Sequence, residues 1–373
     1  MSNGITFQVG TPELRASSSP LPKFVILRKS PPRQYLESQT FSCCLFWMVG
    51  AGCLVVTGIY LPHMTPLRIC VARTLLLIIA LSGARGTAQA RDASARLDRL
   101  IAQHMAGKSG AVVVMEVASG RIVAQWNPRV AALRVRAPGS TVKPFVLLEL
   151  LRLGKLDPQQ HMACHRSLTI AGRHMDCTHS PAVTDLDAAD AIAYSCNTYF
   201  AAVSTRLTAD ELFQALVRTG FRSSTGLGRD EAVGRMRLAA DQDHLQLQAL
   251  GYWGVEVTPL ELLFAYRSLA QHKLNNDLPE AGPVFSGLEH AVQYGMAHEA
   301  EPAGITAAGK TGTAAGTASP QAHGLFVGYA PAEKPEIALV VYLENGRGRD
   351  AAAIAAPVFT AFGKANRSAG VAR

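Results

Sequence analysis

The sequence predicts an α/β fold of the α+β type, in which helices flank one central antiparallel sheet. Strand patterns occur near both ends of the region after residue 90, and a long, mostly helical stretch covers about residues 138–298. Strands at both ends of a helical middle are typical of one sheet that the two ends complete together. No internal repeat and no linker divides residues 91–373, so we expect a single domain there.

Local patterns predict the individual elements. Apolar residues recur at three- and four-residue spacing in a helix expected over residues 91–108, at Leu97, Leu100, Ile101 and Met105. The turn Ser119-Gly120 joins two apolar segments, 111–117 and 121–126, as a β-hairpin. Thr258 and Pro259 are suited to be the cap and first residue of a later helix. Three further strands and a closing helix are expected over residues 310–314, 324–329, 336–343 and 350–362.

The net charge of +8 is concentrated in the first quarter of the chain. Residues 1–90 contain eight basic and two acidic side chains, so the remainder carries only +2. Lys and Arg beside an apolar run set the orientation of a segment in a membrane. Residues 91–373 show no basic stripe interleaved with aromatic residues, so we expect no nucleic-acid partner.

Two apolar runs precede residue 91. Residues 41–61 provide the about 20 residues that a membrane helix needs, and basic residues precede them. Residues 64–90 resemble a secretory signal peptide, with two arginines, an apolar stretch and an Ala88-Gln89-Ala90 cleavage site.

These runs allow two interpretations of the N-terminal region. Residues 1–63 are either a mis-assigned extension before a true start at Met64, or a leader with a membrane anchor at 41–61. Both interpretations place residues 91–373 in the cell envelope, in the periplasm or anchored outside the cytoplasmic membrane.

The segment around Ser140 predicts an activated nucleophile. Pro144 is tolerated only in the first turn of a helix, so a helix must begin close to Ser140. Lys143 lies three residues after Ser140 and therefore on the same helix face. A buried lysine has a lowered pKa and can accept the serine proton. An isolated S-x-x-K pattern is more often a capping serine with a surface lysine, so further motifs are needed.

Two further motifs follow in the chain. Ser195 and Asn197 form an S-x-N pattern 55 residues after Ser140, and Lys310-Thr311-Gly312-Thr313 follows after another 115 residues. Ser195 can relay a proton to a leaving amine, and the Asn197 amide can hold substrate backbone. Lys310 with the threonine hydroxyls suits a terminal carboxylate, and Gly312 permits close approach of substrate backbone. The three motifs match the set of serine penicillin-recognising enzymes in the required order.

Residues from about 110 to 365 resemble the transpeptidase domain of bacterial penicillin-binding proteins. The resemblance implies a β-lactamase/transpeptidase-like fold, an acyl-enzyme on Ser140 formed from D-Ala-D-Ala stem peptides of peptidoglycan, and acylation of Ser140 by β-lactams. It implies that Lys143, Ser195, Asn197 and Lys310 are catalytic, and that Thr311, Gly312 and Thr313 bind substrate. It also implies an oxyanion hole formed by the backbone N–H groups of Ser140 and Thr313.

Three alternatives remain open for the function. A D,D-carboxypeptidase or endopeptidase differs from a D,D-transpeptidase only in whether water or an amine resolves the acyl-enzyme. A β-lactam sensor is less favoured because no multi-span signalling domain is found. A β-lactamase is less favoured because no glutamate is placed to activate water for deacylation, as in the class A enzymes.

The other polar and aromatic residues predict no cofactor. We expect Cys164 and Cys177 to form a disulfide, since they are 13 residues apart in an exported loop. The alternatives are free thiols or a zinc site with His165, His174 or His179. Cys196 is expected to point inward as a small core residue. Tyr252 and Trp253 either line the substrate groove or pack, and packing is favoured.

Overall fold

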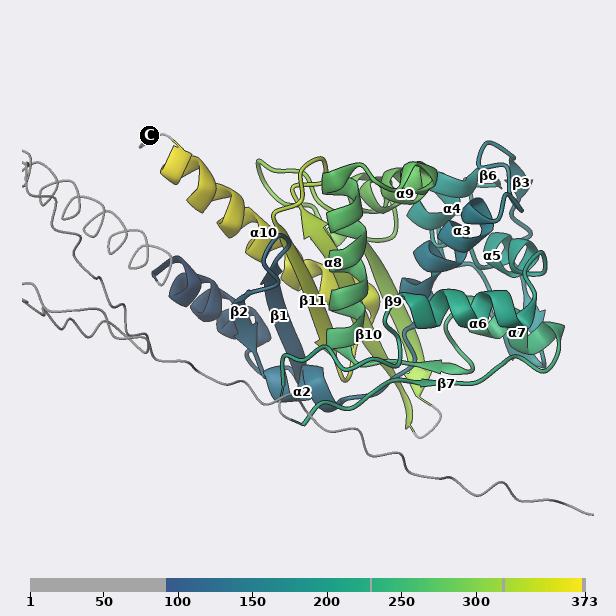
Figure 1. The fold of residues 1–373 in the computed structure, drawn as a ribbon, viewed down its shortest axis with the longest axis horizontal. Helices are drawn as coiled ribbons and strands as arrows, with labels where there is room; N and C mark the ends of the chain where they lie inside the picture. Colours follow the sequence, from purple (N-terminus) through teal and green to yellow (C-terminus); the bar gives the residue numbers. More distant parts are fainter. Residues whose placement is uncertain (1–91, 229, 317–318, 371–373) are drawn as a thin grey trace, which may run out of the picture. The chain divides into compact units, whose positions relative to one another are not determined.

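The computed structural model describes residues 92–370 except residues 229 and 317–318 (Figure 1). The predictions for residues 1–63, 41–61 and 64–90 therefore lie outside the described residues. Within the described part of the chain, no helix is both long enough and apolar enough to cross a membrane.

One five-stranded antiparallel sheet forms the centre of the fold, as predicted. Its strand order is β2-β1-β11-β10-β9. The strands are β1 (Gly110–Glu116), β2 (Ile122–Trp126), β9 (Ala308–Gly316), β10 (Ser319–Ala330) and β11 (Ile337–Leu343). The predicted hairpin is present as β1 and β2, and the first strand pairs directly with the last, with Gly110 opposite Leu343. The two ends of the domain thus complete one sheet, and β9 lies at its edge.

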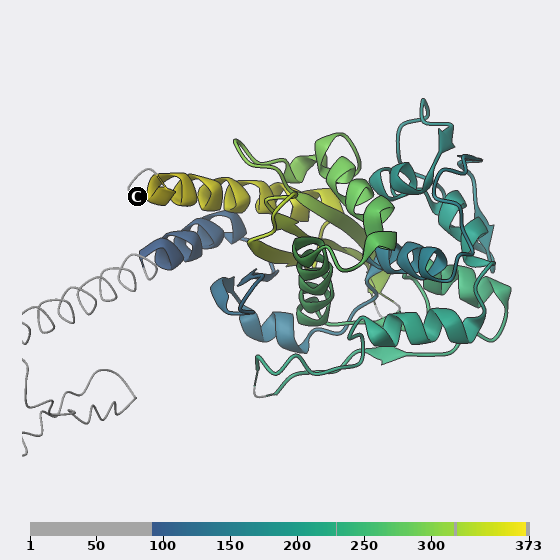
Figure 2. The same cartoon turned by 45° about the horizontal axis from the view of Figure 1, so that its top comes forward.

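Helices cover both faces of the sheet (Figures 1 and 2). Alternate residues of β11 face opposite sides: Leu339 and Val341 pack in one buried cluster, and Val340 and Tyr342 in the other. The first cluster includes the helix over residues 92–105 and α10 (Gly348–Gly370). The second includes α8 (Pro259–Asn275) and the helices of the middle of the chain. Because side chains alternate along a strand, a central strand covered on both faces is apolar throughout.

The predicted helical middle is divided into short helices on the β9 side of the sheet (Figure 1). They are α3 (Lys143–Arg152), α4 (Ala188–Ala193), α5 (Asn197–Ser204), α6 (Ala209–Arg218), α7 (Gln242–Ala249) and α9 (Gly282–Gln293). The remaining short elements are α2 (Pro128–Leu133), η1 (Gly139–Val142), η2 (Pro279–Ala281), η3 (His298–Ala300), β3 (Met162–Ala163), β4 (Thr169–Ile170), β5 (Arg173–His174), β6 (Asp185–Leu186), β7 (Arg235–Met236) and β8 (Val255–Glu256).

The predicted start of α8 is confirmed. The Thr258 hydroxyl accepts from the backbone N–H of Glu261, and the Glu261 carboxylate accepts from the backbone N–H of Thr258. This reciprocal capping box satisfies two N–H groups that the helix itself leaves unpaired. Pro259 follows in the first turn, where its missing N–H costs nothing.

Candidate active site

Ser140 lies in a 3₁₀ turn rather than in an α-helix, and the α-helix α3 begins at Lys143. The turn is fixed from several sides. Gly139 has a left-handed backbone (φ 55°) and donates its N–H to the Gly251 carbonyl at 3.0 Å. A Cβ on Gly251 would lie 2.1 Å from the Gly139 oxygen, so this contact requires glycine. The sequence predicted the helix start correctly, but not this close packing.

Two buried side chains hold the backbone on either side of Ser140. Tyr266 of α8 donates its hydroxyl to the Thr141 carbonyl at 2.8 Å. His323 of β10 lies 2.7 Å from the Ala137 carbonyl through Nε2, and burial lowers the pKa of this imidazole. A neutral His323 can donate this hydrogen bond from Nε2. His323 is therefore a buried residue whose ring is hydrogen-bonded within the core.

Lys143 is completely buried and is hydrogen-bonded to the S-x-N motif. Its Nζ donates to the Ser195 carbonyl at 2.7 Å and to Oδ1 of Asn197 at 2.6 Å, and it lies 3.4 Å from the Ser195 hydroxyl. The Ser140 side chain is half-buried, and its hydroxyl has no hydrogen bond to any described residue. The structure therefore brings Lys143, Ser195 and Asn197 into direct contact one turn after Ser140.

The position of Ser195 depends on a strained turn before α5. Ser195 has a left-handed backbone (φ 54°), which a non-glycine residue adopts only when its surroundings enforce it. Asn197 then begins α5, and its Nδ2 donates to the Met175 carbonyl at 2.9 Å. The Asn197 amide thus connects Lys143 with the loop after β5.

Burial controls the proton affinity of Lys143. Loss of solvation lowers its pKa to about 8, although negative charge on the Cys196 and Cys177 sulfurs acts in the opposite direction. An amine with this pKa is partly neutral near pH 7 to 8 and can accept a proton there.

The K-T-G motif lies on the edge strand β9, beside the Ser140 turn. A Cβ on Gly312 would lie 2.6 Å from the Pro138 carbonyl oxygen, so the two backbones are in contact. The Tyr252 hydroxyl donates to the Thr313 carbonyl at 2.7 Å. Tyr252 and Trp253 pack against the core, as favoured from the sequence, but the hydrogen bond that connects Tyr252 to β9 was not predicted.

The side chains of this motif have partners in the protein. Lys310 is completely buried and donates to the Thr311 carbonyl at 3.2 Å. Burial and the charge of Lys143 hold the pKa of Lys310 well below its usual range. Thr311 donates its hydroxyl to the Met296 carbonyl at 3.1 Å, and the Thr313 hydroxyl accepts from the Gly348 N–H at 2.8 Å. A hydroxyl that accepts a hydrogen bond in this way keeps its own proton as a donor.

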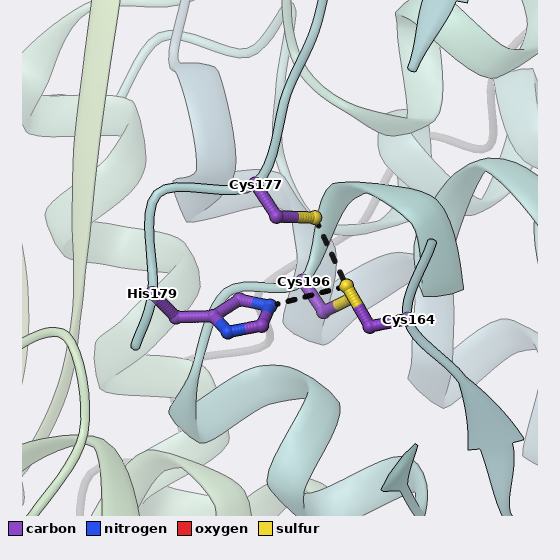
Figure 3. A group of neighbouring side chains, drawn as sticks. All are labelled: Cys164, Cys177, His179 and Cys196. Atoms are coloured by element: carbon purple, nitrogen blue, oxygen red, sulfur yellow. Dashed lines mark hydrogen bonds between the residues drawn. The ribbon is translucent and has the colours of Figure 1, made fainter. Parts of the chain in front are cut away.

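The predicted disulfide between Cys164 and Cys177 is wrong. Both thiols are free, as is that of Cys196, and the Cys177 sulfur lies 3.7 Å from the Cys196 sulfur (Figure 3). Cys196 is a buried core residue as expected, and its sulfur also lies beside the Cys177 sulfur. The physical reason is that the fold brings several chain segments together here. The sulfur of Cys177 therefore lies beside that of Cys196, 19 positions further along the chain, and is not bonded to that of Cys164.

A serine at a helix start, with a buried lysine one turn on and an edge strand alongside, characterises enzymes that react through an acyl-serine. A family model described as the penicillin binding protein transpeptidase domain matches residues 110–363. The chain therefore belongs to this family, as the sequence motifs predicted.

Two curated relatives are similar in sequence. Peptidoglycan D,D-transpeptidase MrdA of Acinetobacter baumannii is 26% identical, and the match covers 70% of this chain and 52% of the relative. The probable peptidoglycan D,D-transpeptidase PenA of Neisseria gonorrhoeae is 24% identical over the same shares of the two chains. The chain thus spans about half the length of the curated relatives that it matches.

Solved structures confirm the fold. The TP domain of Burkholderia pseudomallei penicillin-binding protein 3 matches with a TM-score of 0.65 and 21% identity, covering 76% of this chain and 94% of the other. The D,D-transpeptidase domain of a peptidoglycan glycosyltransferase from Eggerthella lenta matches with a TM-score of 0.64 and 22% identity, covering 72% and 81%.

The pKa of Lys143 predicts a pH dependence. If Lys143 accepts the Ser140 proton, acylation requires the neutral amine, which becomes more abundant as the pH rises through about 8. The rate of acylation by a β-lactam that does not titrate in this range should rise about tenfold from pH 7 to pH 9. Stopped-flow measurement of the rate checks this, with the circular dichroism spectrum as a control for folding. A flat rate across this interval would remove Lys143 as the base.

Proposed function

We propose that this chain is a peptidoglycan D,D-transpeptidase that forms an acyl-enzyme on Ser140 and is acylated there by β-lactams. The observation that carries the proposal is the buried Lys143 amine, held by Ser195 and Asn197 one turn from a serine whose hydroxyl is not hydrogen-bonded to a described residue. The named activity of MrdA and PenA agrees with it.

The proposed reaction has two steps. The Ser140 oxygen attacks the carbonyl carbon between the two D-alanines while its proton passes to neutral Lys143. The backbone N–H groups of Ser140 and Thr313 stabilise the oxyanion. The C–N bond then breaks, and the proton passes through the Ser195 hydroxyl to the departing D-alanine amine. In the second step, the amine of a second stem peptide attacks the acyl carbon and forms the C–N bond of the cross-link. The bond from that carbon to the Ser140 oxygen breaks, and the proton lost by the amine returns through Lys143 to the Ser140 oxygen.

The edge strand β9 supplies the proposed substrate groove. An extended peptide can add to a free sheet edge through backbone hydrogen bonds, and β9 is an edge of the five-stranded sheet. Thr311, Gly312 and Thr313 would contact the substrate backbone there. Lys310 would bind the terminal carboxylate, because an anion beside a buried amine favours its protonated form.

A D,D-carboxypeptidase or endopeptidase remains the second candidate. The same acyl-enzyme is resolved by water in that case, and the groups around Lys143 serve both outcomes equally.

The N-terminal region is proposed to direct residues 91–373 to the cell envelope. Peptidoglycan substrates lie outside the cytoplasmic membrane, so a chain acting on them must be exported. The signal-like segment 64–90, or an anchor at 41–61, would serve that purpose.

The activity is tested with a pentapeptide ending in D-Ala-D-Ala, with and without an amine acceptor. We expect release of one D-alanine per peptide, and in the presence of acceptor a cross-linked product detected by mass spectrometry. Ser140→Ala should abolish both product formation and covalent labelling by a fluorescent penicillin. Ser119→Ala, in an exposed turn, is the matched control and should leave both unchanged. Release of D-alanine without any cross-linked product would favour the carboxypeptidase, and labelling of Ser140→Ala would exclude Ser140 as the nucleophile.

Lys310 provides a second prediction. Loss of a charge-assisted contact costs about 1.5–3 kcal/mol, so Lys310→Ala should slow acylation by a carboxylate-bearing β-lactam roughly 10- to 150-fold. For the same β-lactam with its carboxylate esterified, the acylation rate should fall much less, because the contact between Lys310 and the carboxylate is already absent. The rates of labelling by the acid and by the ester are compared between the unaltered chain and Lys310→Ala. Equal losses would show that Lys310 acts on proton transfer or on the fold instead.

The leader is tested by N-terminal sequencing of the protein isolated from the native envelope. A true start at Met64 followed by cleavage after Ala90 predicts Arg91 as the first residue. Recovery of peptides from residues 1–63 would contradict this start and support the membrane-anchor interpretation.

A further inference from the structure

Four metal-binding side chains converge next to the S-x-N motif (Figure 3). They are Cys164, which follows β3, Cys177 and His179 from the loop after β5, and Cys196 at the start of α5. Their three sulfurs and one imidazole nitrogen all lie within 4.8 Å of one another. Cys177, His179 and Cys196 are buried, and Cys164 is half-buried.

The distances between these atoms fit a tetrahedral zinc site. Zn–S bonds of about 2.3 Å and Zn–N bonds of about 2.0 Å place two sulfurs about 3.8 Å apart, and a sulfur and a nitrogen about 3.5 Å apart. The Cys177 and Cys196 sulfurs are 3.7 Å apart, and Nε2 of His179 lies 3.4 Å from the Cys164 sulfur. A disulfide needs about 2.05 Å between sulfurs and would leave one of the three thiols unpaired.

The groups around the cluster favour bound metal. The backbone N–H groups of Asn197 and Thr198 point at the Cys177 sulfur, at 3.2 and 3.5 Å. The Thr198 hydroxyl lies 3.3 Å from the Cys164 sulfur. Such donors stabilise sulfur as a thiolate, the form that binds metal.

The orientation of His179 also suits a ligand. Its Nδ1 lies 3.1 Å from the Ser180 carbonyl and can donate to it, which leaves the Nε2 lone pair directed at the sulfurs. A hydrogen bond of this kind commonly fixes the tautomer of a metal-bound histidine.

We propose that Cys164, Cys177, Cys196 and Nε2 of His179 bind one zinc ion, and that this ion stabilises the turn carrying Ser195 and Asn197. Binding replaces sulfur–hydrogen bonds with sulfur–zinc bonds and releases those protons to solvent. Four protein ligands leave no open position, so the ion is structural rather than catalytic. The zinc site takes the place of the disulfide that the sequence favoured.

The zinc site reaches the acylation machinery through Cys196, which lies between Ser195 and Asn197. The Asn197 Nδ2 already connects α5 to the Met175 carbonyl, two residues before Cys177. Zinc would cross-link the same two segments, and so hold the amide oxygen that accepts from Lys143. This effect on acylation rests on the proposed function, whereas zinc binding itself does not.

Zinc binding is tested on the full chain purified under reducing conditions without added metal. Elemental analysis should find about one zinc per chain. After chelation, added Co²⁺ should give the intense visible bands and the sulfur-to-metal charge-transfer band of tetrahedral thiolate coordination. A chain with its thiols reduced that binds neither ion, or a disulfide among these cysteines in protein from the native envelope, would overturn the proposal.

Variants of two of the four side chains identify the ligands. His179→Gln and Cys164→Ser should each weaken zinc affinity, measured by competition with a chelating dye. Loss of a hydrogen-bond partner of a ligand typically lowers metal affinity roughly 10- to 100-fold, and loss of a ligand itself should lower it more. His174→Gln is the matched control, because exposed His174 contacts Thr169 and not the cluster, and its affinity should be unchanged. Equal affinity in His179→Gln and His174→Gln would remove His179 from the site. The cobalt spectrum of the unaltered chain tests the site independently if a variant does not fold.

The effect on the active site is measured separately. Fluorescent penicillin should acylate the zinc-loaded chain faster than the metal-free chain, by about 5- to 150-fold as is usual for coupled sites. Zinc binding with equal acylation rates would overturn the coupling and leave the metal site in place. Absence of acylation in both forms would instead contradict the proposed function, while the cobalt spectrum would still decide the metal site.

Discussion

The candidate site depends on the burial of one amine. Lys143 lies in the core at the start of α3, where its Nζ is held by a backbone carbonyl and an amide oxygen from the S-x-N motif. Taking an ammonium group out of water is costly unless it is paired or loses its proton. Among the described residues, its hydrogen-bond partners are neutral dipoles, which hold the amine in place while burial lowers its pKa. The turn before α5 and the loop after β5 are both required for this arrangement.

The rest of the fold positions the three motifs relative to one another. The Ser140 turn is fastened by hydrogen bonds from α8 and β10 and by backbone contact with Gly251. Tyr252, the next residue, also donates to β9. One short segment therefore locates both the serine turn and the edge strand, although it carries none of the three motifs.

Local chemistry explains which features could be predicted from the sequence. The start of α8 follows from Thr258 and Pro259, the hairpin from two apolar runs and a turn, and the start of a helix close to Ser140 from the position of Pro144. The hydrogen bond from Tyr252 to Thr313 and the convergence of Cys164, Cys177 and Cys196 join segments with no local signal between them. The disulfide was predicted wrongly because spacing along a chain does not give the distance between sulfurs. Only the folded structure shows that the thiol of Cys196 and the imidazole of His179 lie close to the other two thiols.

The pairing of β1 with β11 determines the order in which the domain can form. Gly110 has Leu343 as its partner, so the central strand is the last strand to be synthesised. Contacts between residues so far apart form slowly, because a long loop must close before any of them is gained. The sheet cannot be completed while the C-terminal segment is still on the ribosome. A chain of this topology therefore completes its sheet only after nearly the whole domain has been synthesised, and until then β1 and β10 lack the strand that joins them.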